Sequence, residues 1–179
     1  IEEFIDIKTD LDRVTKANIS IRINDDFMKA VENKKPYVCR FVVEATGEVI
    51  EREVDAYKLF MKLVKNNWDF AEPGILFWDN IENNHLLSED KEFKYAGVNP
   101  CAEEPLPAGG SCLLGSINLS EFVNSPFTGN ATFNIEDFKV AVKDCVVGLN
   151  EVLEEGLELH PLQIQKENVS KYRQIGLGV

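Results

Sequence analysis

The sequence predicts an α/β fold, because two kinds of pattern alternate along it. Short stretches in which apolar and polar residues alternate are typical of half-buried strands, and longer stretches with apolar residues at helical spacing are typical of amphipathic helices. Strand and helix patterns that follow one another favour an α/β architecture over a sandwich. The 179 residues, of which 44% are hydrophobic, are enough for a domain with a core, so we treat residues 1–179 as one domain.

A strand, a helix and a hairpin are predicted in the first part of the chain. Apolar and polar residues alternate over 18–23, which predicts a strand. Residues 24–26 are typical of a helix start, and a short apolar face follows them. Two further alternating stretches, 37–43 and 48–54, flank a turn that contains Gly47 and predict a β-hairpin.

A longer helix is predicted to begin after the N-cap residue Asp55 and to end near Trp68. Pro73-Gly74 stops this region, and the continuously apolar residues 75–78 predict a short buried strand. Because tryptophan buries a large apolar area, we expect Trp68 and Trp78 to pack in the core.

The segment 82–110 has little periodicity and contains several Gly and Pro residues. Long stretches of this kind in a compact domain are functional loops or linkers, and the apolar residues and cysteine here favour a folded functional loop. After it, the sequence predicts a strand over 112–119, the strongest helix from Ile135, a second helix after Pro161, and a buried strand over 175–179.

Composition argues against several functional classes. No stretch approaches the roughly 20 apolar residues that span a bilayer, and no signal peptide is visible, so we expect no membrane association and a cytoplasmic location. The 19 basic and 31 acidic residues give a net charge of -12, which repels nucleic-acid phosphates. No metal site is expected, because there is no Cys-x-x-Cys pair and neither His85 nor His160 has a partner at zinc-finger spacing.

Two of the four cysteines are candidates for chemistry. Cys39 lies in an alternating strand pattern and Cys145 in the apolar stripe of a helix, so both are expected to act as small buried hydrophobic residues. Cys101 and Cys112 lie among Gly, Pro and polar residues instead. Without a secretory signal, structural disulfides are not expected, which leaves Cys101 and Cys112 as the reactive thiols.

The residues around Cys101 offer an amide, a thiol and a carboxylate in the run Asn-Pro-Cys-Ala-Glu, 99–103. In an extended conformation Asn99, Cys101 and Glu103 would share one face. The thiol would supply a nucleophile or a hydrogen-atom donor, the carboxylate a base, and the amide a hydrogen-bonding group. From these residues alone, a surface turn with a buried thiol remains the simpler interpretation.

The run 99–106, Asn-Pro-Cys-Ala-Glu-Glu-Pro-Leu, resembles the catalytic subunit of the ribonucleotide reductases, as does 111–119, Ser-Cys-Leu-Leu-Gly-Ser-Ile-Asn-Leu. Residues 17–23, 72–77 and 173–179 are similar to the same family in the same order. The resemblance implies a ribonucleoside-diphosphate reductase type of oxidoreductase, which supplies DNA precursors. It further implies that the chain is a fragment, part of a ten-stranded α/β barrel whose inward finger loop carries Cys101.

The resemblance also implies a role for each candidate residue. Cys101 matches the cysteine that becomes a thiyl radical and abstracts the 3′ hydrogen of the substrate ribose. Glu103 matches the base that takes the 3′-hydroxyl proton, and Asn99 the amide that hydrogen-bonds the substrate hydroxyls. Cys112 matches one of two redox thiols, and its partner is expected outside the chain because no other cysteine here is at the matching position. A dry interior loop would protect the radical.

The subtype that the sequence most resembles is the adenosylcobalamin-dependent branch, in which the cofactor generates the thiyl radical directly. In the competing branch a separate small subunit with a di-iron or di-manganese site supplies the radical. The implied partners are a ribonucleotide substrate, a thioredoxin- or glutaredoxin-type reductant and a second copy of the full-length chain. Because half of the redox pair and the phosphate site are missing, we expect residues 1–179 to be inactive alone.

Two alternatives remain open from the sequence. A glycyl-radical enzyme also carries a radical cysteine on an inner loop of a barrel, but it would need a C-terminal glycyl motif that is not seen here. A non-catalytic acidic interaction domain, with Cys101 and Cys112 merely buried, would lose only stability on Cys101→Ala.

Overall fold

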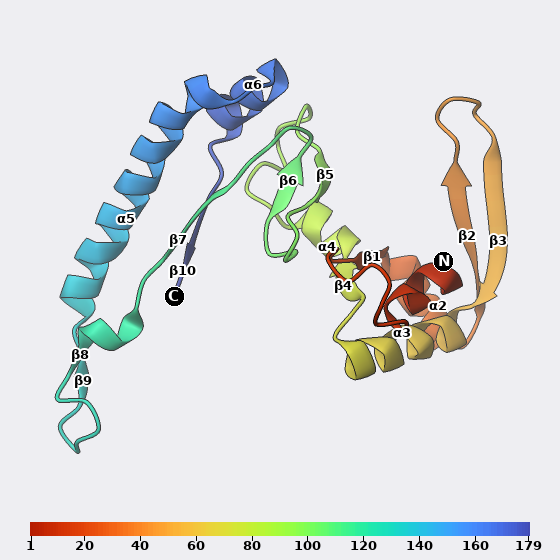
Figure 1. The fold of residues 1–179 in the computed structure, drawn as a ribbon, viewed down its shortest axis with the longest axis horizontal. Helices are drawn as coiled ribbons and strands as arrows, with labels where there is room; N and C mark the ends of the chain where they lie inside the picture. Colours follow the sequence, from red (N-terminus) through yellow and green to blue (C-terminus); the bar gives the residue numbers. More distant parts are fainter. The chain divides into compact units, whose positions relative to one another are not determined.

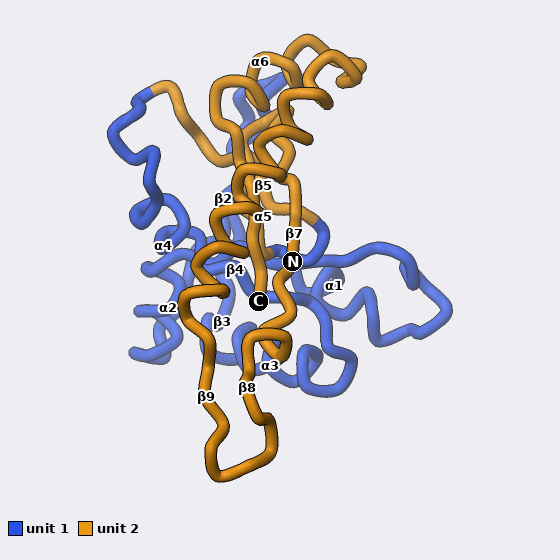
Figure 2. The backbone as a smooth tube through the Cα atoms, turned by 90° about the vertical axis from the view of Figure 1, so that its left-hand side faces the viewer, with its two compact units in different colours: residues 1–91, 100–102 blue, residues 92–99, 103–179 orange.

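The computed structural model describes all residues, 1–179, and the chain divides into two compact units (Figures 1 and 2). Unit 1 contains residues 1–91 and 100–102, and unit 2 contains residues 92–99 and 103–179. Each unit has its own buried apolar residues. No helix in the chain combines the length and the apolar composition that crossing a membrane requires.

Unit 1 contains two short N-terminal helical turns, a hairpin, a parallel strand pair and three further helices. In chain order its elements are α1 (Glu2–Ile5), η1 (Asp6–Lys8), β1 (Ser20–Ile23), α2 (Asp25–Glu32), β2 (Pro36–Val42), β3 (Val49–Asp55), α3 (Ala56–Phe70), β4 (Gly74–Phe77) and α4 (Trp78–Asn83). The predicted strand, helix, hairpin and long helix are therefore confirmed, with small changes in their bounds. One prediction is wrong at its end, since Trp78 begins α4 instead of ending the strand.

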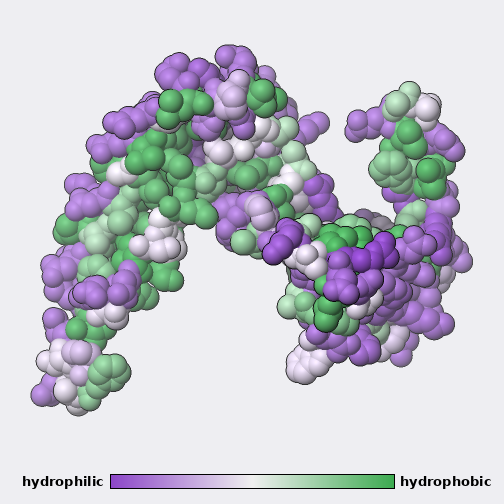
Figure 3. Space-filling view, in the orientation of Figure 1, coloured by the Kyte–Doolittle hydropathy of each residue, from purple (hydrophilic) through white to green (hydrophobic).

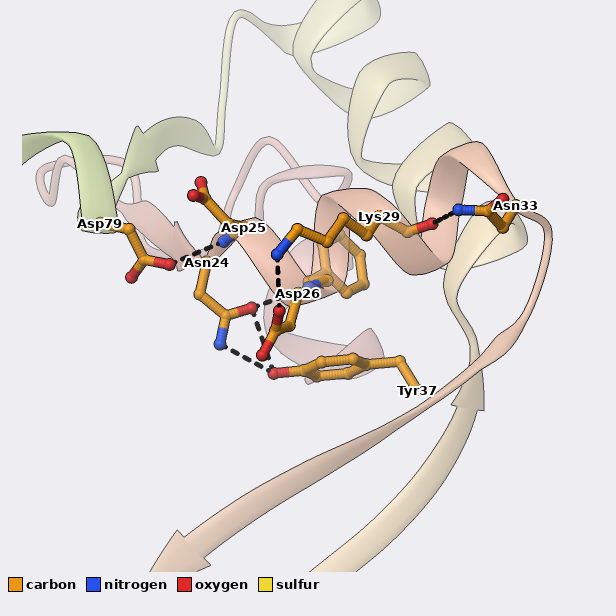
Figure 4. Close-up of polar contacts among 8 residues, drawn as sticks. Asn24, Asp25, Asp26, Lys29, Asn33, Tyr37 and Asp79 are labelled. Atoms are coloured by element: carbon orange, nitrogen blue, oxygen red, sulfur yellow. Dashed lines mark hydrogen bonds and ion pairs between the residues drawn. The ribbon is translucent and has the colours of Figure 1, made fainter.

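Two helices of unit 1, α2 and α3, begin where the sequence predicts, because polar side chains cap them. Asn24 precedes α2, and its side-chain oxygen accepts a hydrogen bond from the Phe27 N–H at 2.8 Å. Asp55 caps α3 in the same way by accepting from the Lys58 N–H at 3.0 Å. Figure 4 shows that Asn24 also faces Tyr37 of β2, so the cap of the helix is tied to the hairpin.

The core of unit 1 forms where α2 and α3 pack with β1, the hairpin and the N-terminal segment. Its members are apolar side chains with 9% exposure or less, namely Ile5, Ile21, Ile23, Phe27, Val31, Val54, Ala56, Leu59 and Leu63. Trp78 is also buried, as predicted, but Trp68 is 87% exposed and that prediction is wrong. Figure 3 shows further apolar residues on the exposed hairpin, which include Phe41 and Ile50.

Unit 2 contains a loop-rich first part, a long helix and a closing strand. Its elements are β5 (Tyr95–Val98), β6 (Pro105–Pro107), β7 (Leu113–Ser116), η2 (Leu119–Phe122), β8 (Val123–Asn124), β9 (Thr132–Phe133), α5 (Ile135–Gly156), η3 (Leu157–Leu159), α6 (Gln163–Tyr172) and β10 (Ile175–Gly178). The two predicted helices and both predicted strands are confirmed. The strand after 112 is shorter than expected because Leu119 begins a 3-10 turn, and the final strand is half-buried instead of fully buried.

The ten strands pair two by two. The β1–β4 and β7–β10 pairs are parallel, whereas β2–β3, β5–β6 and β8–β9 are antiparallel. The prediction of a mixed α/β fold is therefore confirmed. Residues 1–179 do not form a closed barrel, because the five pairs are separate two-stranded sheets.

Candidate active site

The segment 95–107, inside the long region predicted to be a functional loop, forms a small antiparallel pair of β5 and β6 (Figure 1). Asn99 makes two hydrogen bonds with Glu104 across the turn between these strands. Its backbone N–H donates to the Glu104 carbonyl oxygen at 3.1 Å, and its side-chain oxygen accepts from the Glu104 N–H at 3.0 Å. The loop is therefore held at its base by one asparagine.

The Asn99 side chain also makes a hydrogen bond to Glu103, the residue predicted to act as the base. Its Nδ2 donates a hydrogen bond of 2.5 Å to Glu103 Oε1. Asn99 is half-buried and Glu103 is exposed, so the carboxylate is held at the surface with one oxygen already bound. The two residues meet through a turn and not through the extended conformation considered above, since Ala102 has a left-handed backbone with φ of 68°.

Cys101 is grouped with unit 1, and its side chain is exposed. The preceding Pro100 is anchored in that unit, because Asn18 Nδ2 donates to its carbonyl oxygen at 3.0 Å. The expected dry, inward-pointing position of the thiol is not seen within residues 1–179, where the strands of a barrel do not close around it. The inward finger loop stays a prediction.

Cys112 lies directly before β7 and is half-buried. Burial is the largest cause that raises the pKa of its thiol to about 12. The neighbouring Glu104 carboxylate adds to this rise through its negative charge and a hydrogen bond, and the charge of Glu103 contributes less. The thiol is therefore held in its protonated form.

Glu104 was not among the residues that the sequence singled out, yet it lies at the centre of this cluster. Its carboxylate rests on the backbone of β10, since a Cβ on Gly176 would lie only 2.5 Å from Glu104 Oε1. Burial raises the pKa of Tyr95 in β5, and the negative charge of Glu104 adds to this rise. The signal that could have revealed it is the glycine inside a strand, which often marks a close approach by another group.

Three of the four predicted site residues thus lie in one cluster of unit 2. Asn99 contacts Glu103, and Glu103 and Glu104 both act on Cys112. The fourth, Cys101, is joined to this cluster by the chain itself, midway between Asn99 and Glu103. An amide, two carboxylates and a half-buried thiol can position hydroxyl groups and accept or hold protons.

Comparison with known proteins gives a family for the whole chain. The family model described as "Ribonucleotide reductase, barrel domain" matches residues 1–179. A "Vitamin B12-dependent ribonucleotide reductase" of Streptomyces clavuligerus is 36% identical over 162 residues, which cover 90% of this chain and 16% of that protein. A "Vitamin B12-dependent ribonucleoside-diphosphate reductase" of Thermoplasma acidophilum is 29% identical over 180 residues, covering 100% of this chain and 22% of that protein.

A third relative, a "Vitamin B12-dependent ribonucleoside-diphosphate reductase" of Mycobacterium tuberculosis, is 29% identical over 162 residues. It is covered over 22% of its length. The chain thus spans 16% to 22% of the length of these curated relatives. The match favours the radical-enzyme interpretation over the glycyl-radical and interaction-domain alternatives.

Proposed function

Because this chain belongs to the ribonucleotide reductase family through its barrel domain, we propose that the longer protein carrying it reduces ribonucleotides to 2′-deoxyribonucleotides. Residues 1–179 supply the part of the active site that reacts with the ribose. The observation that carries this proposal is the 2.5 Å hydrogen bond between Asn99 and Glu103. It joins the amide and the carboxyl group of the two residues that flank Cys101 in the sequence.

Each residue has one task in the proposed reaction. Cys101, as a thiyl radical, takes the hydrogen atom from the 3′ carbon of the ribose and returns it at the end. Glu103 accepts the 3′-hydroxyl proton, for which its exposed carboxyl group is accessible. Asn99 can orient both this carboxylate and the substrate hydroxyls, because its amide has two donor hydrogens and an acceptor oxygen.

Cys112 supplies half of the reducing equivalents. With a second cysteine from outside residues 1–179, it would form a disulfide while the 2′-hydroxyl leaves as water. A dithiol that becomes a disulfide gives up two electrons and two protons, which is the balance that this reduction needs. A thioredoxin- or glutaredoxin-type protein would then reduce the disulfide, and the full-length chain would act as a homodimer.

The relatives named above are described as vitamin B12-dependent, which supports adenosylcobalamin as the radical source. When bound, this cofactor supplies an organic radical by homolysis of its carbon–cobalt bond. The exposed Cys101 side chain fits such a source, since a group that approaches from outside residues 1–179 can reach the thiol. The alternative radical source is a di-metal site in a separate subunit.

The test is ribonucleotide reduction by the full-length reductase that carries this sequence. We expect product with a dithiol reductant and adenosylcobalamin, and a loss of at least about a thousandfold on Cys101→Ala, because no other group can replace the radical thiol. Cys39→Ala is the matched control, since Cys39 packs at the core of unit 1 and should leave turnover nearly unchanged.

Three other results would change the proposal. Product that requires a metal-loaded second subunit would keep the radical chemistry and replace the cofactor. Undiminished product from the Cys101→Ala protein would overturn the role of Cys101. A folded full-length protein that binds nucleotides and yields no product in either condition would refute the reductase function.

A further inference from the structure

We propose that Asn18 and Gln174 are positioning residues that hold the two ends of the segment 100–105, which carries Cys101. Each donates a side-chain amide hydrogen to the carbonyl oxygen of the proline at one end of this segment. The inference deepens the proposed function, because it rests on that function for the radical role of Cys101. The two hydrogen bonds stand without it.

The two hydrogen bonds are alike, although their donors come from opposite ends of the chain. Asn18 Nδ2 donates to the Pro100 carbonyl oxygen at 3.0 Å, within unit 1. Gln174 Nε2 donates to the Pro105 carbonyl oxygen, also at 3.0 Å, within unit 2. The donors lie 82 and 69 residues away from their acceptors in the sequence, so folding is needed to form either bond.

Proline suits the ends of a segment that is held rigidly. Its ring fixes φ, and its backbone offers a carbonyl oxygen but no N–H. Because the Pro105 carbonyl can only accept, the amide of Gln174 turns its NH2 group toward it. The other atom of that amide, Gln174 Oε1, is buried without a hydrogen-bond partner, which costs free energy. The amide therefore keeps its bond to Pro105 although its own oxygen stays unpaired.

The backbone next to Asn18 is itself held in place. Ile19 donates its N–H to Glu72 Oε1 at 3.1 Å. The other oxygen of Glu72 pairs with Lys8 Nζ at 2.8 Å, and the Lys8 side chain is only 10% exposed. Asn18 therefore extends from a fixed backbone, which lets its short side chain fix the Pro100 carbonyl group in turn.

The backbone of Gln174 is also held by its neighbours. Its carbonyl oxygen accepts from the Leu113 N–H at 3.4 Å, next to the parallel pairing of β7 with β10. The preceding Arg173 is bound to Glu154 and Asn150 of α5. Both amide donors thus belong to backbone that other contacts fix, as a positioning residue requires.

Holding both prolines restricts the residues between them. The N–H of Glu104 donates to Asn99 Oδ1 at 3.0 Å, and Ala102 has a left-handed backbone with φ of 68°, so the segment already forms a tight turn. A thiyl radical must lie close to the hydrogen that it takes, and a misplacement of about 1 Å can cost about a hundredfold in rate. The two amides therefore place the Cys101 sulfur before the substrate binds.

The first experiment measures how firmly the segment is held in the full-length protein. Hydrogen–deuterium exchange of peptides that cover residues 99–105 is followed by mass spectrometry in wild type, Asn18→Ala and Gln174→Met. Methionine is as unbranched and flexible as glutamine, but it has no N–H donor. One hydrogen bond shifts an opening equilibrium by about two- to tenfold, so we expect exchange in each variant to be faster by about this factor.

Two matched variants separate these contacts from the loss of any amide. Asn67→Ala removes a hydrogen bond of the same length in unit 1, from Asn67 Nδ2 to the Pro73 carbonyl oxygen. Gln165→Met, in α6, replaces another glutamine of unit 2 whose amide oxygen is buried and unpaired. Both controls should leave the exchange of residues 99–105 unchanged.

The second experiment asks whether the hold on the segment serves the reaction. We expect Asn18→Ala and Gln174→Met to lower kcat for ribonucleotide reduction by about tenfold or more and to change KM by less than about twofold, because they displace the thiol and not the substrate. A substrate with deuterium at the 3′ carbon should show a larger isotope effect in both variants. A mere loss of folded protein would lower kcat without changing the isotope effect.

Unchanged exchange of residues 99–105 in folded Asn18→Ala and Gln174→Met proteins would overturn the proposal, and so would faster exchange with undiminished kcat. If Gln174→Met does not fold, Asn18→Ala decides alone, since Asn18 is exposed. The exchange measurement requires no turnover. Faster exchange in the variants of a protein that makes no deoxyribonucleotide would refute the proposed function and leave the two contacts established.

Discussion

Asn24 shows how one side chain in unit 1 connects two elements. Its oxygen accepts from the Phe27 N–H at 2.8 Å and caps α2. Its Nδ2 donates to the Tyr37 hydroxyl at 3.1 Å, and Tyr37 in turn packs edge-on against Phe27 with ring centroids 5.3 Å apart (Figure 4). The cap and the aromatic contact therefore support each other.

We predict that Asn24→Ala lowers the free energy of unfolding of unit 1 by about 1 kcal/mol, the usual cost of removing an N-cap. Asn24→Ser is the matched control. Serine keeps a capping oxygen, but its side chain is too short to contact Tyr37. Asn24→Ser should therefore retain most of the free energy of unfolding that Asn24→Ala loses. Urea unfolding followed by fluorescence measures both, and equal losses in the two variants would show that the Tyr37 contact dominates.

Residue-scale predictions from sequence succeeded where the cause is local. Asn24 and Asp55 cap helices because the N–H groups that they satisfy lie three residues away in the chain. The Asn99–Glu103 hydrogen bond is likewise local, and both residues were singled out from the sequence, whereas their roles in catalysis stay predictions. Glu104 was missed because its significance comes from Cys112 and Gly176, which only the folded chain brings near it.

At the scale of elements, the N-terminal segment α1–η1 is fixed to α3 and to the residues after it by polar contacts. Asp6 pairs with Lys62 at 2.5 Å, and Lys8 pairs with Glu72 at 2.8 Å. The buried Asn66 donates to the Ile5 carbonyl oxygen at 3.0 Å. The hydrogen bond from Lys62 lowers the pKa of Asp6, and the hydrogen bond from Lys8 lowers that of Glu72.

These shifts predict how unit 1 responds to acid. A carboxyl group whose pKa is lower in the folded state stabilises the fold above its unfolded pKa, and this stabilisation is lost as the pH falls through the folded value. We therefore expect unit 1 to lose stability as the pH falls below about 4.5, the ordinary value for Glu72. Urea midpoints measured across this range check the expectation.

Glu72→Gln provides the specific test of this pH dependence. The variant should be less stable than wild type at neutral pH, and the difference should shrink in acid, where Glu72 is protonated in both states. Glu32→Gln, at an exposed position in α2, should show no such convergence. If Glu72→Gln lowers the free energy of unfolding by the same amount at neutral and at acid pH, the Lys8 ion pair is not the cause of the loss.

Element types could be predicted more reliably than which face of an element is buried. The caps and the alternating hairpin pattern identified α3 and the β2–β3 pair. The prediction that Trp68 packs in the core is wrong because Trp68 lies about 180° around α3 from the buried Leu59, on the solvent-exposed face of the helix. The short strands β8 and β9 were missed, since two residues are too few for an alternating pattern.

For the whole molecule, the division into two units gives separate signals for their stability. Both tryptophans of the chain, Trp68 and Trp78, lie in unit 1, so intrinsic tryptophan fluorescence reports that unit alone. Far-ultraviolet circular dichroism reports both units, because the long helix α5 lies in unit 2. The barrel as a whole could be inferred only from resemblance, because the strand pairs here do not join.

We predict that core truncations act on one unit at a time. Leu63→Ala, at a side chain that is 2% exposed, should destabilise unit 1 by about 2–5 kcal/mol and shift the fluorescence transition. Leu153→Ala, 3% exposed in α5, should shift the circular dichroism transition and leave the fluorescence midpoint in place. Parallel shifts of both signals in both variants would show that the units unfold together.

The parallel pairing of β7 with β10 has a consequence for the order of folding. Its register joins Leu113 to Ile175, so a long stretch of chain must be ordered before the pair can form, whereas a hairpin such as β2–β3 closes a short loop. The entropy of closing the longer loop slows such pairing. We therefore expect the contact of Glu104 with Gly176 and the partial burial of Cys112 to be acquired late in folding, so a nascent or partly refolded chain would expose a more reactive Cys112 than the mature protein does.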